Sequence, residues 1–176
     1  MKKYKTPLRY PGGKSRAIKF LDKHIPSKFE KYVEPFLGGG SVAIYLTKMY
    51  PSLSIWVNDL YEPLVNFWKE IQHSGEELYT TLSDLKIKHP SPDSAKGLFL
   101  ESKEIINSQD KSKLERAVAF YVVNKCSFSG LTESSSFSAQ ASDSNFSMRG
   151  IEKLTGYQEI IEDWKITNLS YEDLLT

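Results

Sequence analysis

Apolar and polar positions in residues 31–59 follow a strand, helix, strand order. Residues 31–36 form a short strand-like run, and residues 41–50 place their apolar side chains at helical spacing until Pro51 ends that helix. Residues 53–57 alternate apolar and polar side chains and are rich in β-formers, which predicts a second strand ending at Asn58 and Asp59. The pattern is that of a β-loop-α-β unit with its glycines in the first turn.

Helical spacing dominates the middle of the chain. Residues 63–123 predict helices with two apolar faces, one around Phe67 and Trp68 and one around Phe120 and Tyr121, separated by a loop at 88–93. A shorter helix over residues 16–24 is expected before this unit, with Ser15 as its cap and Pro26 beyond its end. Helical character returns at 150–162, and residues 164–169 predict a third strand.

The composition changes sharply at residues 127–147. This segment contains nine serines interleaved with Phe128, Phe137 and Phe146. Such a composition is typical of an exposed, mobile loop that is disordered when free.

Length and composition narrow the class of protein. The chain has 176 residues, 40% of them hydrophobic and 26% charged, which suits one domain of ordinary size, or a core with one insertion. One cysteine, Cys126, excludes an internal disulfide and the zinc sites that need several thiols. No apolar run is long enough to span a membrane or to serve as a signal peptide, so we expect a cytoplasmic protein.

Charge is distributed unevenly along the chain. Residues 1–31 carry a net charge of +8 and the remainder −7, although the whole chain carries only +1. A basic arm or face that meets an anion, nucleic acid first, is one interpretation, and a solvated lysine-rich first helix is the other.

The residues from Gly38 to Ala43 fit the pattern G-x-G-x-x-A where a strand passes into a helix. Glycines there let a ligand approach the backbone, and the helix N-terminus offers free N–H groups. Asp59 follows Gly38 by 21 residues at the end of the next strand, where a carboxylate accepts ribose hydroxyls. A plain tight turn at the glycines, and a turn or helix-capping aspartate, are the structural alternatives.

Three segments together resemble one family. They are Leu8-Arg9-Tyr10-Pro11-Gly12-Gly13-Lys14, Glu34-Pro35-Phe36-Leu37-Gly38-Gly39-Gly40-Ser41, and Asn58-Asp59. Their order and spacing are similar to those of the Dam-type (D12 class) DNA adenine-N6 methyltransferases. The resemblance implies a doubly wound, Rossmann-like class I methyltransferase sheet with a helical target-recognition insertion, and S-adenosylmethionine as methyl donor.

The resemblance also assigns cofactor-binding roles and a domain layout. Tyr10 and Lys14 would line the S-adenosylmethionine pocket, with Glu34, Phe36, Gly38 and Gly40 as its floor, and Asp59 would hold the ribose. Residues 1–62 would be the cofactor-binding portion, 63–150 the DNA-recognition insertion with its serine-rich loop 127–147, and 151–176 the return to the α/β core.

A recognition hairpin that enters double-stranded DNA is implied for the segment Asn124-Lys125-Cys126-Ser127-Phe128-Ser129-Gly130-Leu131. Asn124 suits a base edge and Lys125 a phosphate, with Gly130 in the same hairpin. A helix-ending turn residue is the alternative for Asn124. The serine-rich run departs from the family's usual Arg-, Asn- and Gly-rich pattern.

The family's Asp-Pro-Pro-Tyr type catalytic tetrapeptide does not occur in this sequence, which has no two adjacent prolines. We therefore expect the chain to carry the cofactor loops and the recognition region of a site-specific, restriction-modification type enzyme, without a catalytic residue of its own. An incomplete sheet would leave an exposed edge, which predicts self-association or a further portion covering it. The alternatives are a non-catalytic, truncated remnant that binds DNA or cofactor and, in the abstract, a nicotinamide-dependent dehydrogenase.

Overall fold

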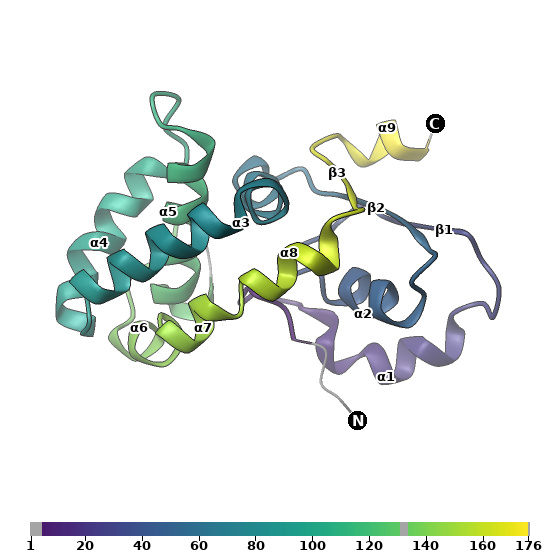
Figure 1. The fold of residues 1–176 in the computed structure, drawn as a ribbon, viewed down its shortest axis with the longest axis horizontal. Helices are drawn as coiled ribbons and strands as arrows, with labels where there is room; N and C mark the ends of the chain where they lie inside the picture. Colours follow the sequence, from purple (N-terminus) through teal and green to yellow (C-terminus); the bar gives the residue numbers. More distant parts are fainter. Residues whose placement is uncertain (1–4, 131–133, 176) are drawn as a thin grey trace.

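The computed structural model describes residues 5–130 and 134–175. A small sheet with the N-terminal helices occupies one end of the molecule, and a group of helices occupies the other (Figure 1). The long helix α3 (Glu62–Lys88) begins beside the sheet and extends into the helical part.

Within residues 5–130 and 134–175, the sheet has three parallel strands in the order β1-β2-β3. They are β1 (Lys31–Glu34), β2 (Ser54–Asn58) and β3 (Lys165–Thr167), as the sequence predicted. Glu34 pairs with Val57, and Asn58 pairs with Thr167, so the carboxyl ends of the three strands meet at one edge. The α/β class is confirmed, and the wider doubly wound order stays a prediction.

Helix α2 (Ser41–Met49) connects β1 to β2 and is confirmed close to its predicted bounds. Its apolar face, with Ala43, Ile44 and Leu46, is fully buried. The burial of such side chains stabilises this unit by about 1.5–3 kcal/mol for each large side chain.

The predicted helix at 16–24 forms as three short pieces. They are η1 (Lys14–Arg16), α1 (Ile18–Leu21) and η2 (Asp22–His24). Ser15, the predicted cap, lies inside η1. The N-cap position is occupied by Gly13, which has no side chain to form a cap hydrogen bond. Only Ile18 is buried among these pieces, so little apolar packing holds them in one helix.

The predicted middle region contains α3, α4 (Pro92–Ile105) and α5 (Lys113–Cys126). Ser91 and Ser112 begin α4 and α5 with reciprocal capping boxes. Helix α3 is kinked at Ser74, and the following Gly75 lies against Gln158 so closely that a Cβ there would be 2.5 Å from the Gln158 Oε1 atom. This close approach brings α3 against α8 (Thr155–Ile161). Helix α3 also packs on α5, so it connects the two ends of the molecule.

The serine-rich segment departs from its prediction. It contains η3 (Phe128–Gly130) and α6 (Ala139–Asn145), and α7 (Met148–Glu152) follows directly. Ser127, Ser142 and Phe146 are buried, so the expectation of a wholly exposed loop is wrong. Buried hydroxyls find partners here, since Ser142 accepts a hydrogen bond from Cys126 Sγ at 3.6 Å. Leu131 and the next two residues lie outside the described residues.

The last elements return to the sheet, as predicted. Helix α8 leads into β3, and α9 (Tyr171–Leu175) follows it. Trp68 and Trp164 are core residues with ring centroids 5.7 Å apart, whereas Trp56 is half-buried. No helix among the described residues combines the length and apolarity that crossing a membrane demands.

Candidate functional site

The glycine loop between β1 and α2 needs glycine at two positions. Gly38 and Gly40 have φ values of +50° and +68°, in the left-handed region that favours glycine. A Cβ on Gly38 would lie 2.9 Å from Tyr10 Cε1, and one on Gly40 would lie 2.9 Å from Trp68 Cζ2. The loop is therefore held between an aromatic ring from the N-terminal segment and one from α3.

Three polar side chains fix the same loop. Asp59 Oδ2 accepts a hydrogen bond from Gly38 N at 3.0 Å, and Trp68 Nε1 donates to Gly38 O at 3.2 Å. Thr6 donates its hydroxyl to Gly39 O. The carbonyl and amide groups of the loop are thus oriented before any ligand binds.

Asp59 also forms a turn. Its Oδ1 accepts a hydrogen bond from Tyr61 N at 3.1 Å, just before α3 begins. The turn role that the sequence allowed is therefore confirmed. The ribose-binding role stays a prediction, and each carboxylate oxygen keeps a second lone pair for it.

A cavity of about 440 Å³ lies beside the glycine loop. Six of the seven residues predicted to bind a cofactor line it, which are Tyr10, Lys14, Glu34, Phe36, Gly38 and Gly40. Asp59 does not line the cavity but is one hydrogen bond away, through Gly38. The fold therefore brings together two segments that the sequence separates by about twenty residues.

Glu34 is the acidic group of this cavity. Its carboxylate is hydrogen-bonded to the Tyr32 hydroxyl and the Ala43 backbone, while its Oε2 atom is buried without a hydrogen-bond partner among the described residues. Burial is the main cause that raises the pKa of Glu34 to about 7, although its hydrogen bonds and the charge of Lys14 act in the opposite direction. A buried carboxylate with an unpaired oxygen favours a cationic ligand.

The other polar and aromatic groups lie at the rim. Lys14 is exposed, and its Nζ donates to Gly12 O at 2.8 Å within the same turn. Phe36, predicted as floor, is 69% exposed, and its ring lies 5.7 Å from that of Tyr171 on α9. Burial, followed by the charge of Asp59, raises the pKa of Tyr10, so its hydroxyl stays neutral.

Asn124, predicted to contact DNA, lies in the interior and is 2% exposed. Its Oδ1 accepts from Arg9 N at 3.0 Å, and its Nδ2 donates to Arg9 O at 2.6 Å and to Gly130 O at 3.2 Å. The side chain thus ties the N-terminal segment to the end of α5, and each of its hydrogen bonds with a described residue is to backbone.

Lys125 and Gly130 are buried beside it. Lys125 Nζ donates to Pro7 O at 2.5 Å, and burial, with a smaller effect of Arg9, lowers the pKa of Lys125 to about 8. Gly130 has a φ of +71°, and a Cβ there would lie 2.6 Å from Arg9 Cβ. In this conformation both residues pack against the N-terminal segment, and their predicted DNA contacts stay a prediction.

Several residues of the site escaped the sequence analysis. Thr6 gives no signal, because its partner Gly39 is 33 residues away. Trp68 was expected only as core, and its indole N–H also holds the glycine loop. Phe128, which the sequence analysis placed in the recognition hairpin without a role of its own, is 68% exposed beside Ser129, which has a φ of 60°.

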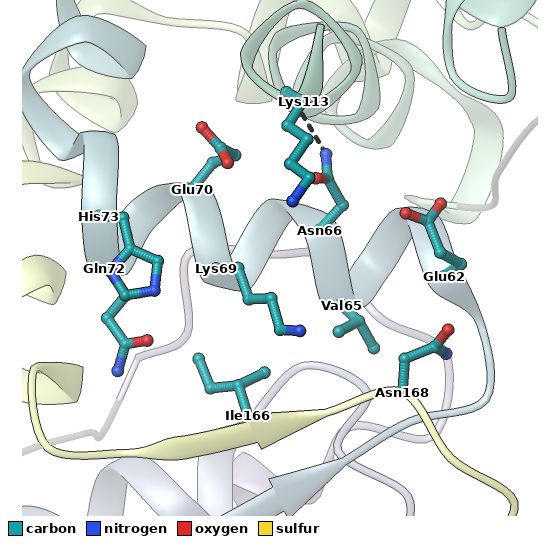
Figure 2. Close-up of a pocket in the computed structure, with 10 residues that line it drawn as sticks. All are labelled: Glu62, Val65, Asn66, Lys69, Glu70, Gln72, His73, Lys113, Ile166 and Asn168. Carbon is teal, nitrogen blue, oxygen red and sulfur yellow. Dashed lines mark hydrogen bonds between the residues drawn. The ribbon is translucent and has the colours of Figure 1, made fainter. Parts of the chain in front are cut away.

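A second cavity, of about 510 Å³, lies between α3 and β3 (Figure 2). Lysines and glutamates both line it, for example Lys69 and Glu70, so the charges are mixed. Asn66 Nδ2 donates a hydrogen bond to Lys113 O at 2.8 Å. None of the predicted site residues lines this cavity.

Comparisons of the sequence with a family profile and with individual known proteins agree with each other. The sequence profile of the D12 class N6 adenine-specific DNA methyltransferases matches residues 10–176. Type II methyltransferase M.MjaIII of Methanocaldococcus jannaschii is 27% identical over 133 residues, which cover 70% of this chain and 46% of that protein. A DNA adenine methylase of Vibrio cholerae is 28% identical over 131 residues, covering 74% and 44%.

A DNA N-6-adenine-methyltransferase of Escherichia phage P1 is 27% identical over 125 residues, covering 71% of this chain and 15% of that protein. The chain thus spans less than half the length of each of these relatives.

Proposed function

Since the chain belongs to the family of D12 class N6 adenine-specific DNA methyltransferases, we propose that it binds S-adenosylmethionine in the glycine-loop cavity and double-stranded DNA through its helical part. The single observation that carries the cofactor assignment is the unpaired, buried Oε2 of Glu34 in a cavity built around Gly38 and Gly40. The proposed reaction class is methyl transfer to the N6 amine of adenine at a specific site.

The residues present fit this cofactor. Its sulfonium and α-ammonium groups are cationic, which matches the unpaired carboxylate oxygen of Glu34. Its α-carboxylate matches the ammonium of Lys14 at the rim, and the ribose hydroxyls match the remaining lone pairs of Asp59. When bound, the cofactor would supply an activated methyl group on a positively charged sulfur, and the sulfur would leave as a neutral thioether when the methyl group passes to an amine nitrogen.

The residues of this chain hold, orient and shield the cofactor. Tyr10 covers the glycine loop, and Gly38 and Gly40 let the ligand approach the backbone. The exposed ring of Phe36 offers a stacking surface for a purine. The Asp-Pro-Pro-Tyr type tetrapeptide is not among these 176 residues, so we assign no residue of this chain to the target amine.

DNA binding is proposed for the face that carries Phe128. A base must leave the stack before its amine is accessible, and an exposed aromatic ring next to a cation suits the bases and phosphates around such a site. Arg9 supplies the cation, and its Nη1 also donates to Ser127 O at 2.8 Å, which ties it to the Phe128 turn. The relatives are named as adenine methyltransferases, so we propose adenine as the target base of this protein. We also propose that the protein acts on DNA in the cytoplasm.

The test is calorimetric titration of the full chain with S-adenosylmethionine. We expect binding by the parent chain and at least a tenfold loss in Glu34→Gln, because a neutral amide cannot pair with the ammonium group. The control is Glu30→Gln, since Glu30 is exposed just before β1. Equal affinity for both variants and the parent would refute the cofactor assignment, and preferential binding of a nicotinamide dinucleotide would favour a dehydrogenase.

A second assay distinguishes an enzyme from a binding remnant. Duplex DNA is incubated with the chain and methyl-labelled S-adenosylmethionine, and label in the DNA is counted. Incorporation supports methyl transfer by this chain, whereas cofactor and DNA binding without incorporation supports the alternative of a non-catalytic binding protein.

A further inference from the structure

A basic groove lies where the N-terminal segment crosses the helical part. The cavity has a volume of about 420 Å³, and four cationic side chains line it, those of Lys5, Lys125, Arg149 and Lys153. No carboxylate lines it among the described residues. The acidic residues on α5, α6, α7 and α8, which are Glu115, Asp143, Glu152 and Glu159, are exposed outside the lining.

The groove has a fixed floor. Lys125 is only 9% exposed, and its Nζ donates to Pro7 O at 2.5 Å. None of the four cations makes an ion pair with a described residue. A buried ammonium group without a carboxylate has two donor positions left and favours an anion above it.

The walls of the groove are fixed as well. Tyr157 on α8 donates its hydroxyl to Lys5 O at 2.7 Å, which holds the N-terminal wall. Ser147 caps α7 by accepting from Gly150 N at 3.2 Å, and this turn presents Arg149. The cations therefore extend from three different segments around one cavity.

The basic groove continues to the exposed aromatic residue. A neighbouring cavity of about 270 Å³ is lined by Arg9, Phe128 and Ser129. Ser144 and Asn145 at the end of α6 line both cavities, so the two form one continuous surface. One side of this surface suits bases, and the other side suits their phosphates.

We propose that the basic groove binds the phosphate backbone of duplex DNA, through Lys5, Arg149 and Lys153 above the floor formed by Lys125. This inference rests on the proposed function and extends it, since it names a site for the DNA backbone next to the Phe128 face. Phosphate contacts position a protein on DNA without reading its sequence, so the groove should act equally on duplexes of different sequence. The hydroxyl and amide groups of Ser144 and Asn145 offer further donors to the same phosphates.

The test is a salt titration of DNA binding by fluorescence anisotropy. The full chain, the double variant Arg149→Gln/Lys153→Gln and a control, Lys96→Gln on the exposed face of α4, are titrated against two duplexes of unrelated sequence. Each lost phosphate contact reduces the slope of log affinity against log salt by about 0.9, so the double variant should lose about 1.8. At about 0.1 M salt the affinity should fall roughly eightfold for each contact.

The control should leave the slope unchanged, and melting temperatures show that each variant is folded. A double variant with the parent slope, while the parent binds both duplexes, overturns the groove assignment and leaves the proposed function intact. A parent chain that binds neither duplex overturns both the groove and the DNA-binding part of the proposed function. Calorimetry with S-adenosylmethionine then reports separately on the cofactor site, which the groove variants should not affect.

Discussion

Glu34→Gln should stabilise the ligand-free protein at neutral to basic pH, although it weakens cofactor binding. The pKa of Glu34 is raised from 4.5 to about 7, chiefly by burial. Such a difference corresponds to on the order of 3 kcal/mol between the two protonation states. The folded protein therefore carries a cost when this carboxylate ionises, and a neutral glutamine removes that cost.

The sign follows from proton linkage. Because the pKa of Glu34 is higher in the folded state, the folded state binds the proton more tightly than the unfolded state does. The stability that this group contributes is complete below pH 4.5 and is lost as the pH rises through about 7. The parent chain should therefore lose stability over this range, and Glu34→Gln should show a flatter profile.

The expected gain at about pH 8 is about 1–3 kcal/mol, with the lower end reflecting a glutamine NH₂ that also lacks a partner. For a chain of this size that corresponds to an increase in melting temperature of about 2–12 °C. The assay is thermal unfolding from about pH 5 to about pH 8.5, followed by circular dichroism, with and without S-adenosylmethionine.

Glu30→Gln is the matched control, since its side chain is exposed and its removal should leave the pH profile unchanged. At the same concentration, the ligand should raise the melting temperature of the parent and of the control more than that of Glu34→Gln. A Glu34→Gln protein that melts below the parent at basic pH would refute the account of a costly, unpaired carboxylate.

Three further predictions concern the loop, the turn and the DNA face. Gly40→Ala should destabilise the protein by about 2 kcal/mol or more, because a φ of +68° is strained for alanine and the new Cβ would lie 2.9 Å from Trp68. Urea unfolding measures this loss, and an unchanged midpoint would contradict the prediction. Asp59→Ala should weaken S-adenosylmethionine binding by on the order of 1–3 kcal/mol through the lost acceptor, as measured by calorimetry, and unchanged affinity would remove the ribose role. Phe128→Ala should weaken DNA binding by about 1–3 kcal/mol without lowering the melting temperature, since the ring is 68% exposed; equal anisotropy titrations of variant and parent would exclude stacking by this ring.

Local patterns were enough to predict the strand, loop, helix and strand around Gly38, because periodicity and turn residues act within a few positions. The spacing from Gly38 to Asp59 also identified two groups that the fold joins directly, by a hydrogen bond of 3.0 Å. The cavity residues followed from the family resemblance, since their assembly depends on contacts between distant segments.

Asn124 shows why other parts of the site could not be predicted. A polar residue at the end of a helix is usually exposed. The side chain of Asn124 is buried instead, and its amide forms hydrogen bonds with the backbone of Arg9, 115 residues away. The serine-rich composition predicted exposed side chains, but Ser127 and Ser142 are buried. A serine can be buried when its hydroxyl has a hydrogen-bond partner. Such partners come from tertiary structure, which neither spacing nor composition contains.

The most direct measurement of the central claim is the number of protons released when S-adenosylmethionine binds. Calorimetry near pH 7 in two buffers of different ionisation enthalpy gives this number. Because the pKa of Glu34 is about 7, roughly half of the carboxylates are protonated there and should ionise when the cationic cofactor binds. We predict that the parent chain releases about half a proton more than Glu34→Gln. Binding with the same proton release in both proteins would contradict the pairing of Glu34 with the cofactor.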